Sequence, residues 1–450
     1  MKIVIVGGGK VGEVLCAELS SELNDIILIE KNSIILERLI NKFDITGIEG
    51  NGASYDIQIE AGVQTADIFI AASEMDEVNI IAAILAKKIG AEYTIARVRN
   101  PEYSSQLNFV RETLGISLMI NPELSAARDI ARILKYPSAL SVESFAGNKV
   151  NLIEIEVTEN SPLNSLSLKD FRSRFGTVLV CIIHRDEEII IPSGSTFLKV
   201  GDRIHVTGTY QDLAAFFKIV CRGDKQVKST LIVGGGRIAY YLLHALSQSR
   251  VETKVIDISE ERCEFLSHEF PNATIIQADG TDHDILEEQM INEYDSFVSL
   301  TGVDEENLMA SIFAKHKGVP KVITKMSRIG ILKVLKNINL RSFITPKQIV
   351  ASEIIQFVRA RANTQGSNVE ALYRIADNQV EALQFRVKRG SRVCDIPLTQ
   401  LQTKPDLLVA HIIRGQNVIY PTGNDRLQPH DRVIVVTREK SFDDIDEILK

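Results

Sequence analysis

Hydrophobic positions along this chain fall into short runs of β-branched residues that alternate with longer amphipathic stretches. The first run, residues 2–6, ends at a group of glycines, and apolar residues then recur at helical spacing at Val11, Leu15 and Leu19. Amphipathic stretches follow the later runs too, and the last of them begins at Pro122. Those later runs are residues 25–30, 44–48, 66–72, 93–99 and 116–120. Strands that alternate with helices predict a parallel, doubly wound sheet.

The same pattern occurs a second time later in the chain. Residues 229–239 repeat the opening run and its glycine turn. Further correspondences are residues 278–282 with 50–54, 301–307 with 73–79, Lys325 with Arg97, and Thr345-Pro346 with Asn121-Pro122. A unit repeated in this order predicts two doubly wound domains.

A β-rich segment follows each predicted doubly wound domain, at residues 140–222 and again at 369–450. In each we expect a strand, at 191–194 and 420–423, then a Gly-Asp or His-Asp turn, a further strand and a closing helix. The chain therefore has the order A-B-A′-B′.

The predicted fold class is α/β, with two doubly wound Rossmann-like domains alternating with two small α+β domains. Polar and turn residues near 136–138, 222–225 and 363–367 indicate the linkers. The predicted domains are residues 1–136, 137–223, 224–362 and 363–450.

The first glycines are spaced as Gly7-x-Gly9-x-x-Gly12, which suits the pyrophosphate of a dinucleotide. One glycine makes the turn, one lets phosphate oxygens approach the backbone, and one lets the helix pack on the strand. The helix N-terminus favours the negative charge of the phosphates. Glu30 ends the second run, where a carboxylate accepts hydrogen bonds from a ribose diol. The alternative is a Rossmann-like domain that has kept its fold and lost its ligand.

Residues at the carboxyl edge of the first sheet extend this candidate cofactor site. Arg97 lies there, and a guanidinium matches phosphate geometry, although a solvated strand end is the alternative. Asn51 and Ser73 follow strands at the same edge, where such residues are also often helix caps. A role for Arg99 stays open. The candidates from the residues are Gly7, Gly8, Gly9, Lys10, Val11, Gly12, Glu30, Asn51, Ser73 and Arg97.

The second glycine turn has Ala239 in place of the last glycine, a change that the dinucleotide fingerprint tolerates. Asp257 stands at the position of Glu30. Whether this copy binds a ligand stays open. Its candidate cofactor-binding residues are Gly234, Gly236, Arg237, Ile238, Asp257, Asp279 and Lys325.

Composition argues against several other classes of function. The chain has 51 basic and 59 acidic residues and a net charge of −8, so we expect no broad basic face for nucleic acid. No apolar run approaches the roughly 20 residues of a membrane span. Five cysteines without a C-x-x-C pair are typical of reduced thiols in a cytosolic protein.

Catalytic and metal-binding motifs are missing from the sequence as well. The 8 histidines show no pair at metal-ligand spacing, and the sequence has no Walker A lysine, G-x-S-x-G or H-E-x-x-H motif. The residues therefore predict a ligand-binding sensor that is not an enzyme and holds no metal. The rival hypothesis is a soluble NAD-dependent oxidoreductase, and a further one is a metabolite sensor without a membrane partner.

The A-B-A′-B′ order, the glycine turns with their acids and the segments 76–79 and 304–307 resemble the TrkA family. Members of that family are cytosolic regulatory subunits of Trk/Ktr-type potassium uptake systems and consist of two tandem RCK modules. The resemblance implies NAD(H) as the cofactor, with ATP or ADP as alternatives, and adds Asn79 to the binding residues. The chain departs from the family at Asn51, often Asp, and at His430, where its own first copy has Gly201.

The resemblance also implies a membrane partner, namely a potassium-transporting pore subunit of TrkH or KtrB type that the nucleotide gates. The chain would then be cytoplasmic and peripheral on the inner face of the cell membrane. Apolar rows on the helices after Pro122 and Pro346, together with the resemblance, predict a homo-oligomer, with a tetramer as the expected form. Some relatives sense a cyclic dinucleotide through a C-domain, and that ligand stays open here.

Overall fold

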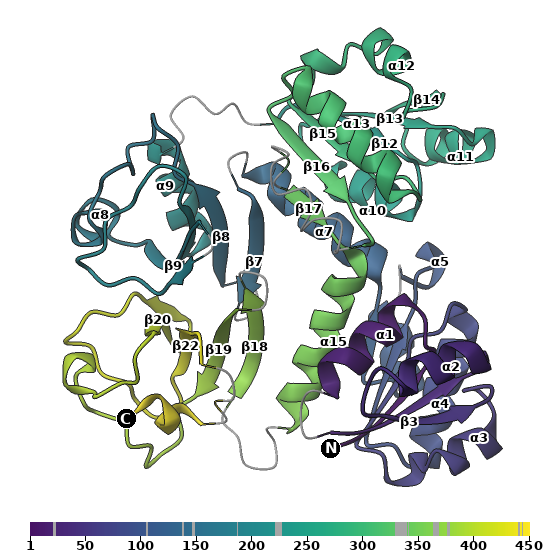
Figure 1. The fold of residues 1–450 in the computed structure, drawn as a ribbon, viewed down its shortest axis with the longest axis horizontal. Helices are drawn as coiled ribbons and strands as arrows, with labels where there is room; N and C mark the ends of the chain where they lie inside the picture. Colours follow the sequence, from purple (N-terminus) through teal and green to yellow (C-terminus); the bar gives the residue numbers. More distant parts are fainter. Residues whose placement is uncertain are drawn as a thin grey trace. The chain divides into compact units, whose positions relative to one another are not determined.

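The computed structural model describes residues 1–450 except 21–23, 105–106, 137–138, 146–148, 187, 221–226, 329–339, 341, 363–368, 376–378, 440–441 and 443. The chain divides into two compact units. One combines residues 1–131 with 227–355, and the other combines residues 132–226 with 356–450. The first unit therefore holds both doubly wound domains, and the second holds both β-rich domains (Figure 1).

The first doubly wound domain is built on a six-stranded parallel sheet with the order β3-β2-β1-β4-β5-β6. Its strands are β1 (Lys2–Val6), β2 (Asp25–Glu30), β3 (Thr46–Glu49), β4 (Ile68–Ala71), β5 (Tyr93–Arg97) and β6 (Leu118–Ile120). Its helices are α1 (Lys10–Leu19), α2 (Ser33–Ile40), α3 (Tyr55–Glu60), η1 (Val63–Thr65), α4 (Asp76–Ile89), α5 (Pro101–Ser104), α6 (Leu107–Leu114) and α7 (Pro122–Lys135). The strand order reverses at β1, so the glycine turn after β1 lies where ligands of such sheets bind.

The second doubly wound domain has the same topology, with the order β14-β13-β12-β15-β16-β17. Its strands are β12 (Ser229–Val233), β13 (Glu252–Asp257), β14 (Thr274–Gln277), β15 (Ser296–Ser299), β16 (Lys321–Lys325) and β17 (Ser342–Ile344). Its helices include α10 (Arg237–Leu246), α11 (Glu260–Glu269), α12 (His283–Glu288), η2 (Ile291–Glu293), α13 (Asp304–His316) and α15 (Pro346–Ala362). The predicted repeat and fold class are confirmed.

The central strands of both sheets are buried on both faces. Ile3, Val4 and Ile5 of β1 have no exposed surface, and neither do Leu231 and Ile232 of β12. Successive side chains of a strand point to opposite faces, so burial of consecutive residues requires helices on both sides of the sheet. This explains why the runs in the sequence are continuously apolar rather than alternating.

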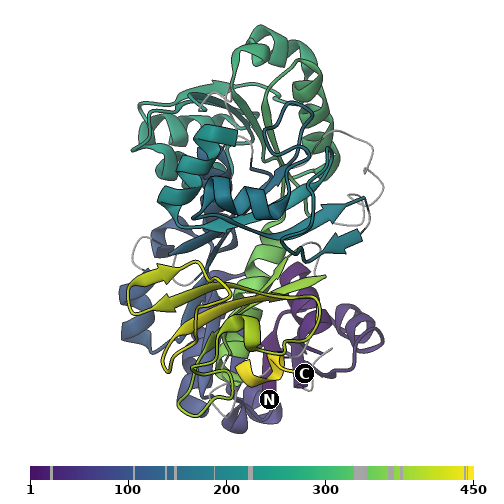
Figure 2. The same ribbon diagram turned by 90° about the vertical axis from the view of Figure 1, so that its left-hand side faces the viewer.

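Each β-rich domain contains a five-stranded antiparallel sheet, with the orders β10-β9-β11-β8-β7 and β18-β19-β22-β20-β21. The first has β7 (Ser141–Phe145), β8 (Val150–Glu156), α8 (Leu168–Phe175), β9 (Leu179–Arg185), β10 (Glu188–Ile190), β11 (Arg203–Gly208) and α9 (Tyr210–Val220). The second has β18 (Val369–Ile375), β19 (Val380–Arg386), η4 (Leu398–Gln400), β20 (Leu407–Arg414), β21 (Asn417–Ile419), β22 (Arg432–Thr437) and η5 (Ile445–Ile448). Buried residues of both sheets share one apolar cluster; in Figure 2 the first sheet is teal and the second yellow-green.

Several predicted element boundaries were wrong. β5 ends at Arg97, so Arg99 lies in the following turn and not on the strand. Residues 191–194 and 420–423 follow β10 and β21 instead of forming strands. The predicted closing helix is present in the first β-rich domain as α9, whereas the second ends in the 3₁₀ turn η5. Helices α5 and α6 were not predicted.

The expected linkers fall largely on residues that the structure leaves undescribed, namely 137–138, 222–225 and 363–367. In the described part of the chain, no helix is both long enough and apolar enough to cross a bilayer. Four cysteines have free thiols, namely Cys16, Cys181, Cys263 and Cys394, while Cys221 lies outside the described residues.

Candidate functional site

A cavity of about 730 Å³ lies in the first unit, and residues of both doubly wound domains line it. Cavities of this size accommodate small-molecule ligands. The sequence-predicted residues that line it are Gly7, Gly9, Lys10, Val11, Glu30, Asn51, Ser73, Arg97, Gly236, Arg237, Ile238 and Lys325. The two glycine turns thus face one cavity, which the sequence did not predict. The predicted residues that do not line it are Gly8, Gly12, Asn79, Gly234, Asp257 and Asp279.

The first glycine turn uses its three glycines for three different steric reasons. Gly7 has a φ of +97°, and a Cβ there would lie 2.9 Å from the Cα of Ser73. A Cβ on Gly12 would lie 1.9 Å from the carbonyl oxygen of Gly7, so α1 packs at a distance that only glycine allows. A Cβ on Gly9 would meet no atom within 4 Å. Gly9 therefore keeps open the side from which an anion can approach the backbone.

The second glycine turn has nearly the same backbone. Gly234 has a φ of +99°, and its Cβ would lie 2.8 Å from the carbonyl carbon of Leu300. A Cβ on Gly236 would again meet nothing within 4 Å. Ala239, at the position of Gly12, is fully buried. The second turn has kept the shape of the first while tolerating one methyl group.

The helices after both turns begin without a capping side chain. Gly9 and Gly236 are the N-cap residues of α1 and α10, and neither helix start has a side-chain cap hydrogen bond. The first N–H groups of each helix therefore keep their capacity to bind an anion. Pro122 and Pro346, which begin α7 and α15, also line the cavity. The dipoles of four helices thus place positive potential at this cavity.

Glu30 lies at the end of β2 and holds the glycine turn from the side. Its Oε2 accepts a hydrogen bond from the N–H of Gly8 at 2.5 Å, and its Oε1 accepts one from the N–H of Asn32 at 3.0 Å. A carboxylate offers about four lone-pair sites, so Glu30 keeps acceptor capacity for a ligand hydroxyl. Asp257 accepts the equivalent bond from the N–H of Gly235 at 2.5 Å, but it does not line the cavity.

Asn79 is fully buried behind the cavity wall. Its Oδ1 accepts hydrogen bonds from the N–H and the hydroxyl of Ser73, and its Nδ2 donates to the carbonyl oxygens of Ser73 and Arg97. Asn307 makes the equivalent backbone bonds in the second domain. Asn79 therefore joins the ends of two neighbouring strands and positions Ser73 and Arg97, which do line the cavity.

Asn51 and Asp279 begin equivalent turns and neither is a helix cap, since Ser54 and Asp282 hold the cap positions of α3 and α12. The Oδ1 of Asn51 accepts a hydrogen bond from the N–H of Ala53 at 3.2 Å. Hydrogen bonds from the hydroxyl and N–H of Thr281 lower the pKa of Asp279. Only Asn51 lines the cavity.

Basic side chains outnumber acidic ones on the cavity wall. The basic residues are Lys10, Lys31, Arg97, Arg99, Arg237, Lys325 and Lys347, and the acidic ones are Glu30, Glu74 and Glu123. Burial lowers the pKa of Arg97 and of Lys325, and a neighbouring cation lowers each further. The Nε of Arg97 is buried and has no hydrogen-bond partner among the described residues. An anion in the cavity would stabilise these charges.

Arg99 also reaches the cavity, but the protein already engages its guanidinium. The Nε lies 3.5 Å from a carboxylate oxygen of Asp76, and an Nη donates to the carbonyl oxygen of Glu74. Lys347, Glu123 and Lys31 are lining residues that the sequence did not single out. The sequence feature that could have pointed to Lys347 and Glu123 is the proline that precedes each of them in the repeat.

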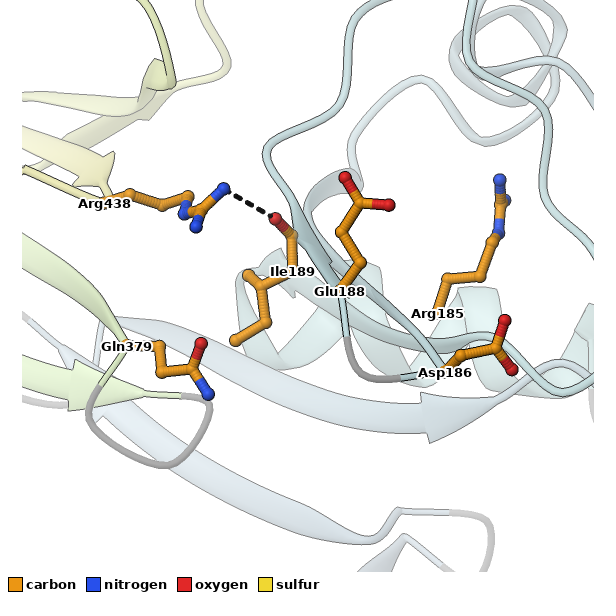
Figure 3. Close-up of a pocket in the computed structure, with 6 residues that line it drawn as sticks. All are labelled: Arg185, Asp186, Glu188, Ile189, Gln379 and Arg438. Atoms are coloured by element: carbon orange, nitrogen blue, oxygen red, sulfur yellow. Dashed lines mark hydrogen bonds between the residues drawn. The ribbon is translucent and has the colours of Figure 1, made fainter.

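A second hollow, of about 450 Å³, lies in the unit formed by the β-rich domains (Figure 3). Arg438 donates a hydrogen bond to the carbonyl oxygen of Ile189 at 3.3 Å. The guanidinium of Arg185 bonds both carboxylate oxygens of Asp202 at 2.8 Å. Glu188 adds an acidic side chain on the same wall. Because its charges have both signs and the arginines are engaged, this hollow does not match a phosphate ligand.

A polar network, buried at His411 and Thr207 and half-buried at Tyr420 and Asp212, joins the two β-rich domains. The Nε2 of His411 lies 2.8 Å from the hydroxyl oxygen of Thr207. The hydroxyl of Tyr420 bonds the carboxylate of Asp212 and accepts the N–H of Thr209 at 2.9 Å. Burial lowers the pKa of His411 to about 3, so this imidazole is neutral at ordinary pH. Among the described residues, no group of His, Cys, Asp and Glu could hold a metal ion.

Two doubly wound domains with glycine turns, each followed by a small antiparallel domain, define a class of proteins with tandem pairs of TrkA-N and TrkA-C domains. The TrkA-N domain model matches residues 3–122 and 230–346, and the TrkA-C domain model matches residues 152–220 and 382–450. The chain belongs to the TrkA family of Trk system potassium uptake proteins.

Known relatives match this chain from end to end. A Trk system potassium uptake protein TrkA homolog of Archaeoglobus fulgidus is 31% identical over 452 residues, with 100% of each chain covered. The Trk system potassium uptake protein TrkA of Vibrio alginolyticus is 29% identical over 447 residues, covering 98% of this chain and 97% of the relative.

Solved structures share the fold at lower identity. The GsuK RCK domain has a TM-score of 0.63 at 15% identity, covering 97% of this chain and 92% of that one. The GsuK channel bound to NAD has a TM-score of 0.65 at 15% identity, covering 98% of this chain and 78% of that one. These likenesses establish the RCK fold.

Proposed function

We propose that this chain binds NAD(H) at its first glycine turn, with ATP or ADP as alternative ligands, and thereby regulates a membrane pore for potassium. The observation that carries the proposal is the cavity at which the glycine turns, uncapped helix starts and basic side chains meet. The pyrophosphate would lie against the backbone at Gly9 and Lys10, with Arg97 as a further phosphate ligand. Glu30 would accept hydrogen bonds from the ribose diol.

The names of relatives support the same function. The Vibrio alginolyticus relative is a Trk system potassium uptake protein, and GsuK has been solved with NAD and with ADP. We therefore propose a pore subunit of TrkH or KtrB type as the partner, and a peripheral position on the cytoplasmic face of the membrane. We also propose a homo-oligomer, with a tetramer as the expected form, and domains at 1–136, 137–223, 224–362 and 363–450.

We propose that helices α7 and α15 link nucleotide binding to the regulation of the pore. Each begins at the cavity wall and ends among residues of the second unit. A ligand shifts an equilibrium between two arrangements only if it binds one of them better than the other. Coupling of this kind is typically worth about 1–3 kcal/mol, or roughly 5–150-fold in affinity. In this proposal the nucleotide acts as a signal and is not consumed.

The test uses Gly9→Asp, with Gly236→Asp as its matched counterpart in the second turn. Neither Cβ would meet an atom within 4 Å, and Asp is a favoured N-cap residue, so both variants should fold. The new carboxylate would repel phosphate. In cells that lack the natural protein, Gly9→Asp should abolish nucleotide-dependent control of rubidium uptake, whereas the wild-type chain should restore it. If Gly9→Asp regulated rubidium uptake in response to nucleotide as the wild-type chain does, the proposal would be contradicted.

A turnover assay distinguishes the proposed sensor from the rival hypothesis of an oxidoreductase. Incubation of the full chain with NADH or NAD and a panel of carbonyl and hydroxyl substrates should change no cofactor absorbance, while calorimetry shows binding. Sustained oxidation or reduction of the cofactor, abolished by Gly9→Asp, would favour the enzyme instead.

A further inference from the structure

The cavity reaches different parts of the two doubly wound domains. In each domain, the residues around the acid form the nucleoside side of the glycine turn, because the ribose and base of a ligand would lie there. The nucleoside side of the first turn lines the cavity with Glu30, Ile35 and Asn51. The equivalent residues of the second domain are all described, and none of them lines the cavity: Asp257, Arg262 and Asp279. The second turn therefore faces the cavity only with the start of α10.

Ile35 and Arg262 occupy equivalent positions in the repeat. Each is the third residue of the helix that follows the acid, α2 in the first domain and α11 in the second. Ile35 lies over the first glycine turn, since a Cβ on Gly8 would be 2.9 Å from its Cγ2. Because Ile35 also lines the cavity, it gives the first turn an apolar surface suited to a nucleoside.

Arg262 bonds the second glycine turn directly. Its Nε and one Nη donate to the carbonyl oxygen of Gly235 at 3.0 Å and 2.8 Å. The N–H of Gly235 donates to the carboxylate of Asp257, so side chains of the domain engage both backbone polar groups of this glycine. The half-buried Arg262 therefore spans the distance between α11 and the turn.

Aromatic side chains hold Arg262 from the other side. Its guanidinium carbon lies 5.1 Å from the centre of the Phe265 ring, an arrangement in which the cation is attracted to the aromatic face. The ring of Phe265 stacks in turn on Tyr240, with centroids 5.8 Å apart. At the positions of these two aromatic residues the first domain has Arg38 and Glu13, which form an ion pair. The second domain thus has its own set of contacts that keep Arg262 at the turn.

From this difference, and resting on the proposed nucleotide function, we infer that Arg262 closes the nucleoside side of the second turn, so that each chain binds one nucleotide, at its first turn. The bonded guanidinium occupies the space between α11 and Gly235 that a ribose and base would have to enter. Asp257 then supports the turn alone, whereas Glu30 supports its turn and also meets the ligand. Arg262 is a specificity-determining residue that does not itself touch the nucleotide.

An arginine near the acid of a glycine turn is also a feature of sites that bind the 2′-phosphate of NADP(H). The contacts favour closure over that role. Two N–H groups of Arg262 already donate to a backbone carbonyl, and the carboxylate of Asp257, which would repel a 2′-phosphate, lies at the same glycine. NADP(H) is nevertheless included among the ligands of the test.

Calorimetric titration of the full-length chain with NAD(H) measures the number of sites. Wild type should show close to one site per chain, and Gly9→Asp should show none. Arg262→Ile gives the second turn the residue of the first and should add a site, which remains when Gly9→Asp is combined with it. Arg262→Lys keeps a long cation that can bond the carbonyl oxygen of Gly235, so it should leave the number of sites unchanged.

The reciprocal substitution in the first turn is Ile35→Arg. It should weaken NAD(H) binding by at least about tenfold, because the new side chain closes the first turn as Arg262 closes the second. Ile34→Arg is the matched control for added charge, since Ile34 is the neighbouring residue, is 77% exposed and does not line the cavity. Its affinity for NAD(H) should equal that of wild type. Thermal unfolding of each variant checks that it is folded.

Four results would overturn the inference while leaving nucleotide binding intact. The first is close to two NAD(H) sites per wild-type chain, one of which is lost in Gly236→Asp. The second is no added site in a folded Arg262→Ile protein, and the third is wild-type affinity in Ile35→Arg. The fourth is NADP(H) binding by Gly9→Asp that Arg262→Ile abolishes. Failure of the wild-type chain to bind NAD(H), ATP or ADP would instead remove the proposed function and this inference with it.

Discussion

The carboxylate of Glu30 accepts the backbone N–H of Gly8 at 2.5 Å, so the residue predicted to hold a ribose also holds the glycine turn. Glu30→Ala therefore removes two functions at once and should weaken NAD(H) binding by roughly ten- to a hundredfold. Glu30→Gln keeps an oxygen for Gly8 but loses the charge that repels a 2′-phosphate. It should bring the affinities for NADP(H) and NAD(H) closer together.

Calorimetry with both dinucleotides tests this, with circular dichroism as the check on folding. Asp257→Asn is the matched control, because it changes the equivalent bond to Gly235 and does not line the cavity. An unchanged preference for NAD(H) in Glu30→Gln would show that Glu30 only supports the turn.

Gly12 and Ala239 predict opposite responses to a methyl group at equivalent positions. Gly12→Ala would place a Cβ 1.9 Å from the carbonyl oxygen of Gly7, so we expect a loss of about 1–3 kcal/mol of stability. Ala239→Gly should cost about 1–2 kcal/mol, from lower helix propensity and the loss of a buried methyl group. Thermal unfolding of both variants measures the effects. A Gly12→Ala protein as stable as wild type would mean that α1 can move away from the turn.

Asn79 does not line the cavity, but its substitution should still weaken nucleotide binding there. Asn79→Ala leaves buried backbone groups of Ser73 and Arg97 without their partner, which should cost about 1–3 kcal/mol. Because both residues line the cavity, nucleotide affinity at the first turn should fall as well. Asn307→Ala should destabilise the second domain to a similar extent and spare the first turn. Equal affinity losses in the two variants would contradict this separation.

We expect the buried His411 to make the stability of the β-rich unit depend on pH. An ordinary histidine takes up a proton near pH 6.5, but burial lowers the pKa of His411 to about 3 in the folded protein. Between pH 6.5 and about pH 3, this histidine binds a proton in the unfolded chain but not in the folded protein. The free energy of unfolding therefore decreases as the pH falls. The double variant His411→Leu with Thr207→Val removes this group together with its hydrogen-bond partner.

Thermal midpoints of the double variant and wild type, compared across this pH range, give the measurement. The thermal midpoint of the double variant should rise relative to that of wild type as the pH falls below 6.5. Parallel curves would show that His411 takes no part in the acid response.

Much of the fold could be predicted because its signals are local. The apolar runs, the glycine turns and the repeat all follow from spacing along the chain, and each doubly wound domain has the expected parallel sheet. The errors occurred where local signals are weak. Residues 191–194 contain proline and glycine and form no strand, and η5 replaces the expected helix at the end of the chain.

The candidate site was harder to predict, because its parts meet only after folding. Gly9 and Glu30 could be found from the motif, whereas the role of Asn79 behind the wall and the place of Lys347 on the wall depend on how distant segments come together. The opposite charges of Glu123 and Lys347 are visible in the repeat. Nothing in the sequence shows that both face one cavity.

The most direct test of the account is calorimetric titration of the full-length chain with NAD(H), ATP and ADP, repeated on Gly9→Asp and Gly236→Asp. The account predicts that wild type binds NAD(H), that Gly9→Asp loses the binding assigned to the first turn while its thermal midpoint is unchanged or slightly raised, and that Gly236→Asp retains it. No binding by wild type, or the wild-type isotherm in a folded Gly9→Asp protein, would contradict the claim that the first glycine turn is a nucleotide site.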